Sequence, residues 1–289
     1  MADSSVAHAH ESHEIEQANW EGASEPFKAS YGKLMMWYFL VSDAFTFAGF
    51  LIAYGALRFS MPTWPEPDFV FASFPFVNAH WPLVFVTLMT FILIFSSVTM
   101  VRAVQEGHRD NQRGVVFWMF LTILGGIAFL GCQAYEWTTL IAKEHMTVDR
   151  NPFGRHPYDG VEIMPDGTEK PFKKGDNYLI HGHRVMQGGQ SVIEFDVPKV
   201  RYNESVNQGK VVEASFGPKA FGGLFFFITG FHGFHVFSGV VFLTIIAINA
   251  ASGLYARRAN HYEMVEKIGL YWHFVDLVWV FVFLVFYLL

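Results

Sequence analysis

The chain has 289 residues, of which 52% are hydrophobic, 18% aromatic and only 16% charged, and its formal net charge is −6. The apolar residues come in long unbroken runs, which excludes an ordinary soluble domain. The single cysteine, Cys132, excludes a disulfide framework and a cysteine-based metal site. We also expect no nucleic-acid partner.

The first 27 residues contain six acidic residues and three histidines but no lysine or arginine. The first apolar run begins too late for a signal peptide. We therefore expect residues 1–30 to form a disordered acidic tail ahead of a transmembrane domain over residues 31–289. The spacing of His8, His10 and His13 would bind a metal ion only if the tail folded around one, so a solvated tail is favoured.

Five apolar stretches are long enough to cross a bilayer. Crossing the hydrocarbon takes roughly 20 mostly apolar residues in a helix, because only a helix satisfies all of its own backbone hydrogen bonds. The sequence therefore predicts an all-α membrane protein, a bundle of five transmembrane helices. The expected spans are residues 34–57, 81–104, 115–141, 220–250 and 268–289.

Basic residues collect on one side of the predicted spans. The N-terminal segment and the loops after the second and fourth spans contain Lys28, Lys33, Arg102, Arg109, Arg113, Arg257, Arg258 and Lys267. Five spans place the two termini on opposite faces, and short basic loops stay in the cytoplasm. The N-terminus is therefore expected to be cytoplasmic and the C-terminus external.

The segment of about residues 142–219, between the third and fourth spans, has eleven basic and eleven acidic residues. It is too long for the charge rule to govern, but the predicted orientation makes it external. Turn signals at 165–167 and 187–190, with alternating residues at 192–197, predict a small β-rich insertion.

Six ionisable residues lie inside or close to the spans, and each should face protein. They are Asp43, Glu136, His232, His235, His273 and Asp276. Ionisable groups in hydrocarbon cost several kcal/mol, so each one is a candidate for an ion pathway, a ligand or buried polar packing.

Metal ligation by these histidines is disfavoured. His232 and His235 are three residues apart on one helix, whereas bis-histidine haem ligation needs facing helices at matching depth. At 1.5 Å per residue, His273 lies roughly 9 Å beyond Lys267, while His235 lies roughly 22 Å from the same face. Histidines that are hydrogen-bonded inside the bundle are the favoured interpretation.

The depths of the acids suggest a proton or ion pathway. Asp43 and Asp276 each lie roughly 15 Å from the cytoplasmic basic residues, so they could occupy one layer. If they share a site, one would stay protonated, since two close carboxylates resist ionising together. Glu136 approaches the external membrane interface, and Tyr135 and Trp137 flank it in the sequence. This position favours an anchor or a partner contact over a proton relay.

Segments of four spans match a known family in order and spacing. They read TGFHGFHVFSGVVFL from Thr229 to Leu243, YWHFVDLVWVFVF from Tyr271 to Phe283, FLVSDAFTFAGF from Phe39 to Phe50 and FLGCQAYEW from Phe129 to Trp137. Together they closely resemble cytochrome c oxidase subunit III, in a short five-helix bacterial form, since many members have seven spans. Family positions are matched directly by Glu136, His232, His235, Trp272, His273 and Asp276. Asp43 stands where the family usually has a glutamate.

The resemblance implies a non-catalytic subunit of a proton-pumping haem–copper oxidase in the bacterial plasma membrane, transferring electrons from cytochrome c to oxygen through other chains. It implies no haem or copper in this chain, metals in partner subunits I and II, and phospholipids bound between the helices. The seven family-matched residues, Asp43 included, would support proton uptake or contact lipid. The insertion is a candidate docking surface for an electron donor or a neighbouring respiratory complex, and a solvated excursion fits equally well.

Three other functions stay open. A quinol oxidase has a nearly identical third subunit, an ion-coupled transporter would explain the intramembrane acids, and a haem-bearing anchor would explain the histidines. Transporters tend to show internal repeats with broken helices, whereas this sequence shows no matched halves, and Pro82 opens a span rather than breaking one. No phosphate-binding loop or activated nucleophile points to soluble-enzyme chemistry.

Overall fold

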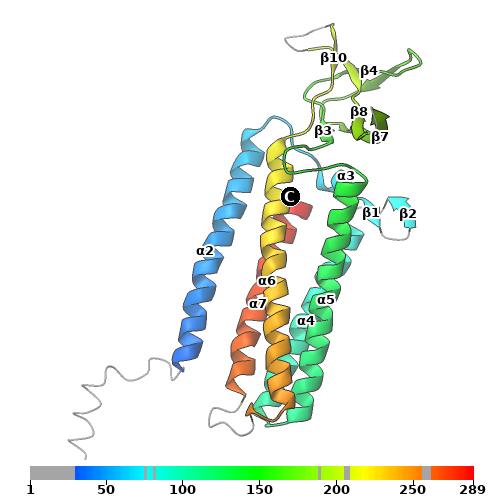
Figure 1. The fold of residues 1–289 in the computed structure, drawn as a ribbon. Coiled ribbons are helices and arrows are strands. Elements are labelled where there is room, and N and C mark those ends of the chain that lie inside the picture. Colours follow the sequence, from blue (N-terminus) through cyan, green and yellow to red (C-terminus); the bar gives the residue numbers. More distant parts are fainter. Residues whose placement is uncertain (1–29, 75–76, 81–82, 188–189, 205–208, 256–261) are drawn as a thin grey trace, which may run out of the picture. The chain divides into compact units, whose positions relative to one another are not determined.

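The computed structural model describes residues 30–74, 77–80, 83–187, 190–204, 209–255 and 262–289 (Figure 1). The predicted acidic tail, with its three histidines, lies outside these residues except for Ser30. The chain divides into two compact units, one up to Ser42 and one from Asp43 to Leu289. The helix packing given below is that of the second unit.

Within the described residues, five helical segments are long and apolar enough to cross a membrane, which confirms the five predicted spans. They are α2 (Tyr31–Ser60), α4 (Val84–His108), α5 (Gln112–Ala142), α6 (Lys219–Ala251) and α7 (Glu263–Phe283), which continues through the π-turn η3 (Leu284–Leu288). The last span begins five residues earlier than predicted, because Glu263 and Lys267 pair at 3.3 Å across its first turn. The predicted start of the second span, at residues 81–82, lies outside the described residues.

A three-residue turn joins α4 to α5. Asn111 caps α5 by accepting a hydrogen bond from the backbone N–H of Gly114 at 3.3 Å. Its side-chain amide donates to the carboxylate of Glu106 at 2.6 Å. So short a connection makes α4 and α5 antiparallel neighbours.

The helices α4, α5, α6 and α7 close into a ring, in which α4 and α6 each contact both α5 and α7. Small residues permit the close approach. A Cβ atom on Gly126 of α5 would lie 2.6 Å from the indole of Trp272 and 2.7 Å from Val240, and one on Gly125 would lie 2.7 Å from Ser96. Trp272 is fully buried at this crossing. Close helix contact through small residues is how membrane helices gain packing energy.

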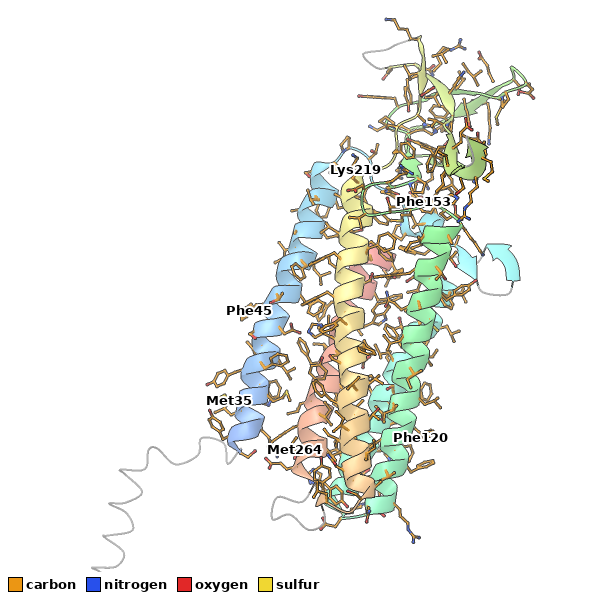
Figure 2. All side chains as sticks on the ribbon, in the orientation of Figure 1. Met35, Phe45, Phe120, Phe153, Lys219 and Met264 are labelled. Carbon is orange, nitrogen blue, oxygen red and sulfur yellow. The ribbon has the colours of Figure 1, made fainter. Side chains whose placement is uncertain are left out.

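The outer surfaces of the helices carry large apolar side chains. Phe45 and Phe95 are 73% and 71% exposed, and Phe120 and Ile248 are also more than half exposed. Figure 2 shows Phe45 and Phe120 projecting from their helices. Apolar surface of this extent requires an apolar solvent. The chain is a multi-pass membrane protein.

The segment between α5 and α6 contains short antiparallel strands, as predicted (Figure 1). They are β3 (Phe153–Arg155), β4 (Gly160–Ile163), β5 (Glu169–Phe172), β6 (Asn177–Leu179), β7 (His181–Gln187), β8 (Gln190–Asp196), β9 (Lys199–Tyr202) and β10 (Val211–Glu213). Their pairings are β10-β9-β4-β5, β3-β6 and β7-β8. The predicted turn at 165–167 joins β4 to β5 with Gly167 at φ +84°, whereas residues 188–189 of the other predicted turn lie outside the described residues.

Polar contacts tie this insertion to α6 and to the loop after α2. Asn151 pairs with Gly217 in an isolated bridge, and its amide donates to the carbonyl of Pro218 at 3.2 Å, directly before α6. Glu66, in the loop after α2, accepts hydrogen bonds from Arg155 at 2.6 Å and Asn177 at 2.7 Å. That loop also contains α3 (Pro67–Val70), β1 (Ser73–Phe74) and β2 (Val77–His80), which the sequence did not predict.

An aromatic cluster forms the core of the insertion. His156 is 4% exposed and stacks on Phe172, with ring centroids 3.7 Å apart and an interplanar angle of 13°. Tyr178 and Tyr202 border the same imidazole. Burial lowers the pKa of His156 to about 4, an effect that nearby Asp176 only partly offsets.

Candidate functional site

Asp43 of α2 meets His235 of α6 inside the span. Both are largely buried, and their Oδ2 and Nε2 atoms lie 3.2 Å apart. The Nδ1 of His235 lies 2.9 Å from the carbonyl oxygen of Phe231, one turn earlier, so this nitrogen must carry the donated hydrogen. A hydrogen bond between Nε2 and the carboxylate then needs one further proton, held by either partner. The pair is therefore built to bind a single proton.

Aromatic rings enclose this pair. Phe47 and Phe231 contact the imidazole with ring centroids 5.4 Å and 4.7 Å away. On the other side, the hydroxyl of Tyr271 donates to the backbone carbonyl of His235 at 3.1 Å and meets the hydroxyl of Ser238 at 2.9 Å. Because these rings are apolar, the electrostatic interaction between the carboxyl and the imidazole is screened less than it would be in water.

His273 and Asp276 of α7 face α4 instead. The hydroxyl of Ser97 lies 2.6 Å from the Nδ1 of His273, and the Asp276 carboxyl interacts with the same serine. The structure thus brings Asp276 to Ser97 and Asp43 to His235, rather than the two acids to one another. Equal depth did not place Asp43 and Asp276 in one site, because they lie on helix faces that point to different neighbours.

Trp272 is part of a hydrogen-bond chain that connects three helices. Its indole N–H donates to the hydroxyl of Ser96 in α4 at 3.0 Å, and Ser96 donates to the backbone carbonyl of Thr122 in α5 at 3.1 Å. Thr99 and Thr122 add a contact of 2.8 Å between their hydroxyls. These bonds fix the relative rotation of α4, α5 and α7, and hence the directions of the other polar side chains.

Glu136 faces protein, as expected for an ionisable residue near a span. It is 6% exposed, and its carboxylate accepts a hydrogen bond from the hydroxyl of Tyr287 at 3.0 Å. The reason is helical phase, since Glu136 shares the buried face of α5 with Phe129 and Leu140. His232 is likewise fully buried, with its Nε2 lying 3.1 Å from the carbonyl oxygen of Val275.

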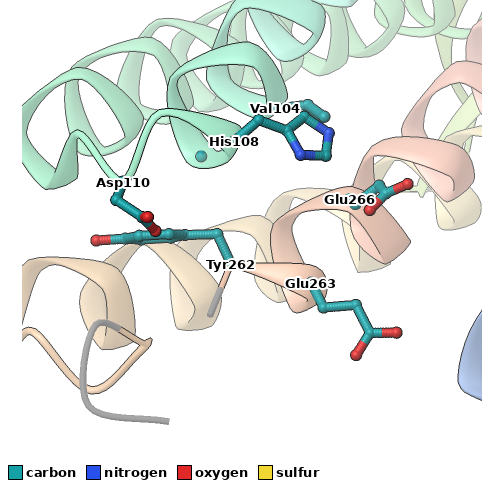
Figure 3. Close-up of a pocket in the computed structure, with 7 residues that line it drawn as sticks. Val104, His108, Asp110, Tyr262, Glu263 and Glu266 are labelled. Carbon is teal, nitrogen blue, oxygen red and sulfur yellow. The ribbon is translucent and has the colours of Figure 1, made fainter. Parts of the chain in front are cut away.

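A pocket between α4 and α7, at the opposite end of these helices from the insertion, gathers acidic side chains (Figure 3). It is lined by Val104, Gly107, His108, Asp110, Tyr262, Glu263 and Glu266. The residues come from the end of α4, the following turn and the beginning of α7. The pocket lies at the end where the sequence places the short basic loops.

Comparison with known proteins adds the decisive observation. The family described as cytochrome c oxidase subunit III matches residues 201–289. A cytochrome c oxidase subunit 3 of Alkalihalophilus pseudofirmus is 26% identical over 257 residues, which cover 89% of this chain and 85% of that protein. Those of Lemur catta and Ornithorhynchus anatinus are each 28% identical over 192 residues, covering 63% of this chain and 69% and 73% of theirs. The chain is similar in sequence to cytochrome c oxidase subunit III.

The part that matches the subunit III family contains His232, His235, Trp272, His273 and Asp276. In the described residues, no three His, Cys, Asp or Glu side chains lie close enough together to hold a metal ion. His235 and His273 are directed to Asp43 and Ser97, respectively.

The sequence did not predict several hydrogen-bond partners of these residues. Tyr271, Ser97 and Tyr287 each contact a residue that had been singled out. A weak signal existed for Tyr271, which directly precedes Trp272 and His273. Serine and tyrosine are too common in membrane helices for the other two to stand out.

Proposed function

We propose that this chain is the non-catalytic third subunit of a proton-pumping haem–copper oxidase of aerobic respiration. The observation that carries the proposal is the similarity to a bacterial cytochrome c oxidase subunit 3 over 89% of the chain. Haem, copper and the oxygen chemistry would then belong to subunits I and II. Cytochrome c is favoured over quinol as electron donor because the relatives are named for it.

The proposed role of the interior is to support proton uptake. In this proposal, the pair of Asp43 and His235 binds one proton in an enclosed site. The acidic pocket of Figure 3 supplies carboxyl groups that exchange protons with solvent at the end of the helices proposed to be cytoplasmic. Asp43 is one methylene shorter than the glutamate usual in the family, yet its carboxyl reaches His235 at 3.2 Å. Phospholipid bound along the helices would complete the packing against subunit I.

A test of the function begins with an affinity tag on this chain. Purification in mild detergent should recover subunits with haem and copper, and recovery of the chain without any haem protein would refute the proposal. Cells lacking the chain should keep the initial rate of oxygen reduction but lose it during sustained turnover. An enzyme that lost all its haem with this chain would contradict a purely supporting role.

We propose that the protein lies in the bacterial plasma membrane with its N-terminus in the cytoplasm and residues 142–219 outside. The exposed side chains of Glu194 in β8 and His108 at the end of α4 offer a matched pair of labelling sites. In intact cells, a membrane-impermeant maleimide should modify Glu194→Cys and spare His108→Cys. The opposite pattern would invert the topology.

The insertion is proposed as a docking surface for an electron donor or a neighbouring respiratory complex. Asn151 and Gly217 are bridged, so residues 153–215 can be replaced by a short glycine–serine linker without separating α5 from α6. The shortened oxidase should assemble with its own subunits but lose association with the donor or neighbouring complex. Unchanged association and turnover would reduce the insertion to a solvated excursion.

A further inference from the structure

Three polar atoms in the interior of α5 and α6 have no hydrogen-bond partner among the residues that the structure describes. They are Nε2 and Oε1 of Gln133 and Nδ1 of His232. Gln133 is 6% exposed and His232 0% exposed, so neither side chain reaches the surface. A buried polar group without a partner costs about 1–3 kcal/mol, and such groups are normally satisfied by protein or by ordered water.

The hydrogen-bonding needs of these atoms are complementary. The Nε2 of His232 lies 3.1 Å from the carbonyl oxygen of Val275, so Nε2 carries the donated hydrogen and Nδ1 of the neutral ring is an acceptor. Trp279 packs against this ring but its indole N–H already donates to Thr90. Gln133 offers a donor and an acceptor in one amide. The partner that is needed must therefore both donate and accept.

Two contacts place Gln133 and His232 at a similar level of the interface between α5 and α6. Phe129, one turn before Gln133 in α5, contacts the ring of His232 with centroids 5.7 Å apart. One turn after Gln133, the indole N–H of Trp137 donates to the hydroxyl of Thr229 at 3.3 Å. These two contacts fix the register of antiparallel α5 and α6, so Gln133 lies opposite the turn from Thr229 to His232.

A small cavity lies farther along α5, between this helix and α4. Glu136, three residues after Gln133, lines this cavity together with Val70, Phe71, Phe85, Val86, Tyr135 and Leu140. The cavity has room for about one water molecule. It lies toward the end of α5 that leads into the insertion, where the carboxylate of Glu136 is bonded to Tyr287.

We propose that this level of the interface between α5 and α6 is a binding site for internal water, held by the Gln133 amide and Nδ1 of His232, with Glu136 at the neighbouring cavity. Water both donates and accepts, which suits the mixed polarity of these groups. A metal ion does not suit them, because the described residues group no set of ligands there. The site is separate from the pair of Asp43 and His235 and does not depend on the oxidase assignment.

Electron cryo-microscopy of the intact complex, purified through a tag on this chain, tests the proposal directly. Density for water should appear at about 2.7–3.2 Å from the Gln133 amide and from Nδ1 of His232. The proposal is overturned if the map shows both side chains bonded to protein groups, or shows no density beside them.

Infrared difference spectroscopy with ¹⁸O-labelled water provides a second readout. Gln133→Leu should abolish an isotope-sensitive O–H stretching band of internal water. The matched control is Thr122→Val, which removes an equally buried hydroxyl whose partners are protein groups, Thr99 at 2.8 Å and the Trp118 carbonyl at 2.9 Å. A band that survives in Gln133→Leu, or is lost equally in the control, contradicts the site. If the leucine variant does not assemble, the wild-type density decides.

Discussion

The stability of the insertion should fall as the pH is lowered from about 7 to about 5, because His156 resists protonation in the folded state. Its pKa is about 4 in the fold against 6.5 for an exposed histidine. Between these values the unfolded chain binds a proton that the folded chain excludes, so stability is complete above about 6.5 and decreases as the pH falls toward 4. Titration between the two pKa values gives a loss of about 2 kcal/mol from pH 7 to pH 5, or roughly 20-fold in the opening constant.

Hydrogen exchange of strand amides in β4, β5 and β9, corrected for the chemical exchange rate at each pH, measures this opening constant. His156→Phe keeps a ring against Phe172 but cannot take up a proton, so its opening constant should vary far less over the same range. His183→Gln, at a half-exposed histidine paired with Asp196, is the matched control and should behave as the wild type. Equal pH dependence in wild type and His156→Phe would refute the reasoning.

Three further substitutions test the helix interior. Asp43→Asn should remove a carboxylic-acid band from infrared difference spectra and slow proton uptake, whereas Asp43→Glu should retain both; an unchanged spectrum in Asp43→Asn would show that this carboxyl never holds the proton. Gly126→Ala should cost about 1–3 kcal/mol because its methyl group would lie 2.6 Å from a tryptophan ring. Gly131→Ala, with nothing within 4 Å, should be near neutral in the same denaturation assay, and equal costs would contradict the packing argument. Tyr287→Phe removes the donor to Glu136 and should lower stability by about 1–3 kcal/mol; an unchanged unfolding midpoint would mean that this hydrogen bond adds nothing.

The number and approximate bounds of the spans could be predicted from the sequence, but not the direction in which each polar residue points. The spans followed from the length of the apolar runs, since lipid tolerates little else. The rotation of each helix about its own axis could not be predicted, because helices that are apolar on both the protein side and the lipid side show little amphipathic pattern. No sequence pattern therefore indicated that Asp43 meets His235 whereas Asp276 meets Ser97.

In the insertion, too, local structure could be predicted from the sequence, whereas long-range contacts could not. The turn signal at 165–167 and the alternating residues at 192–197 predict strands, and β8 confirms the alternating stretch. The pairing of β4 with β9, far apart in the chain, lies beside the buried cluster around His156, and Glu66 contacts β3 and β6 from the loop after α2. Neither has a local sequence signal, because both join residues that are distant in sequence.

The bridge between Asn151 and Gly217 changes the entropy of assembling the membrane helices. Without it, pairing α5 with α6 would close a loop of about 76 residues, from Lys143 to Pro218. With the bridge formed, only the short segments outside it remain to be closed, which lowers the closure cost by about 2 kcal/mol. The folding of the strands offsets the rest of the closure entropy, so a long segment joins α5 to α6 without weakening the packing of these helices.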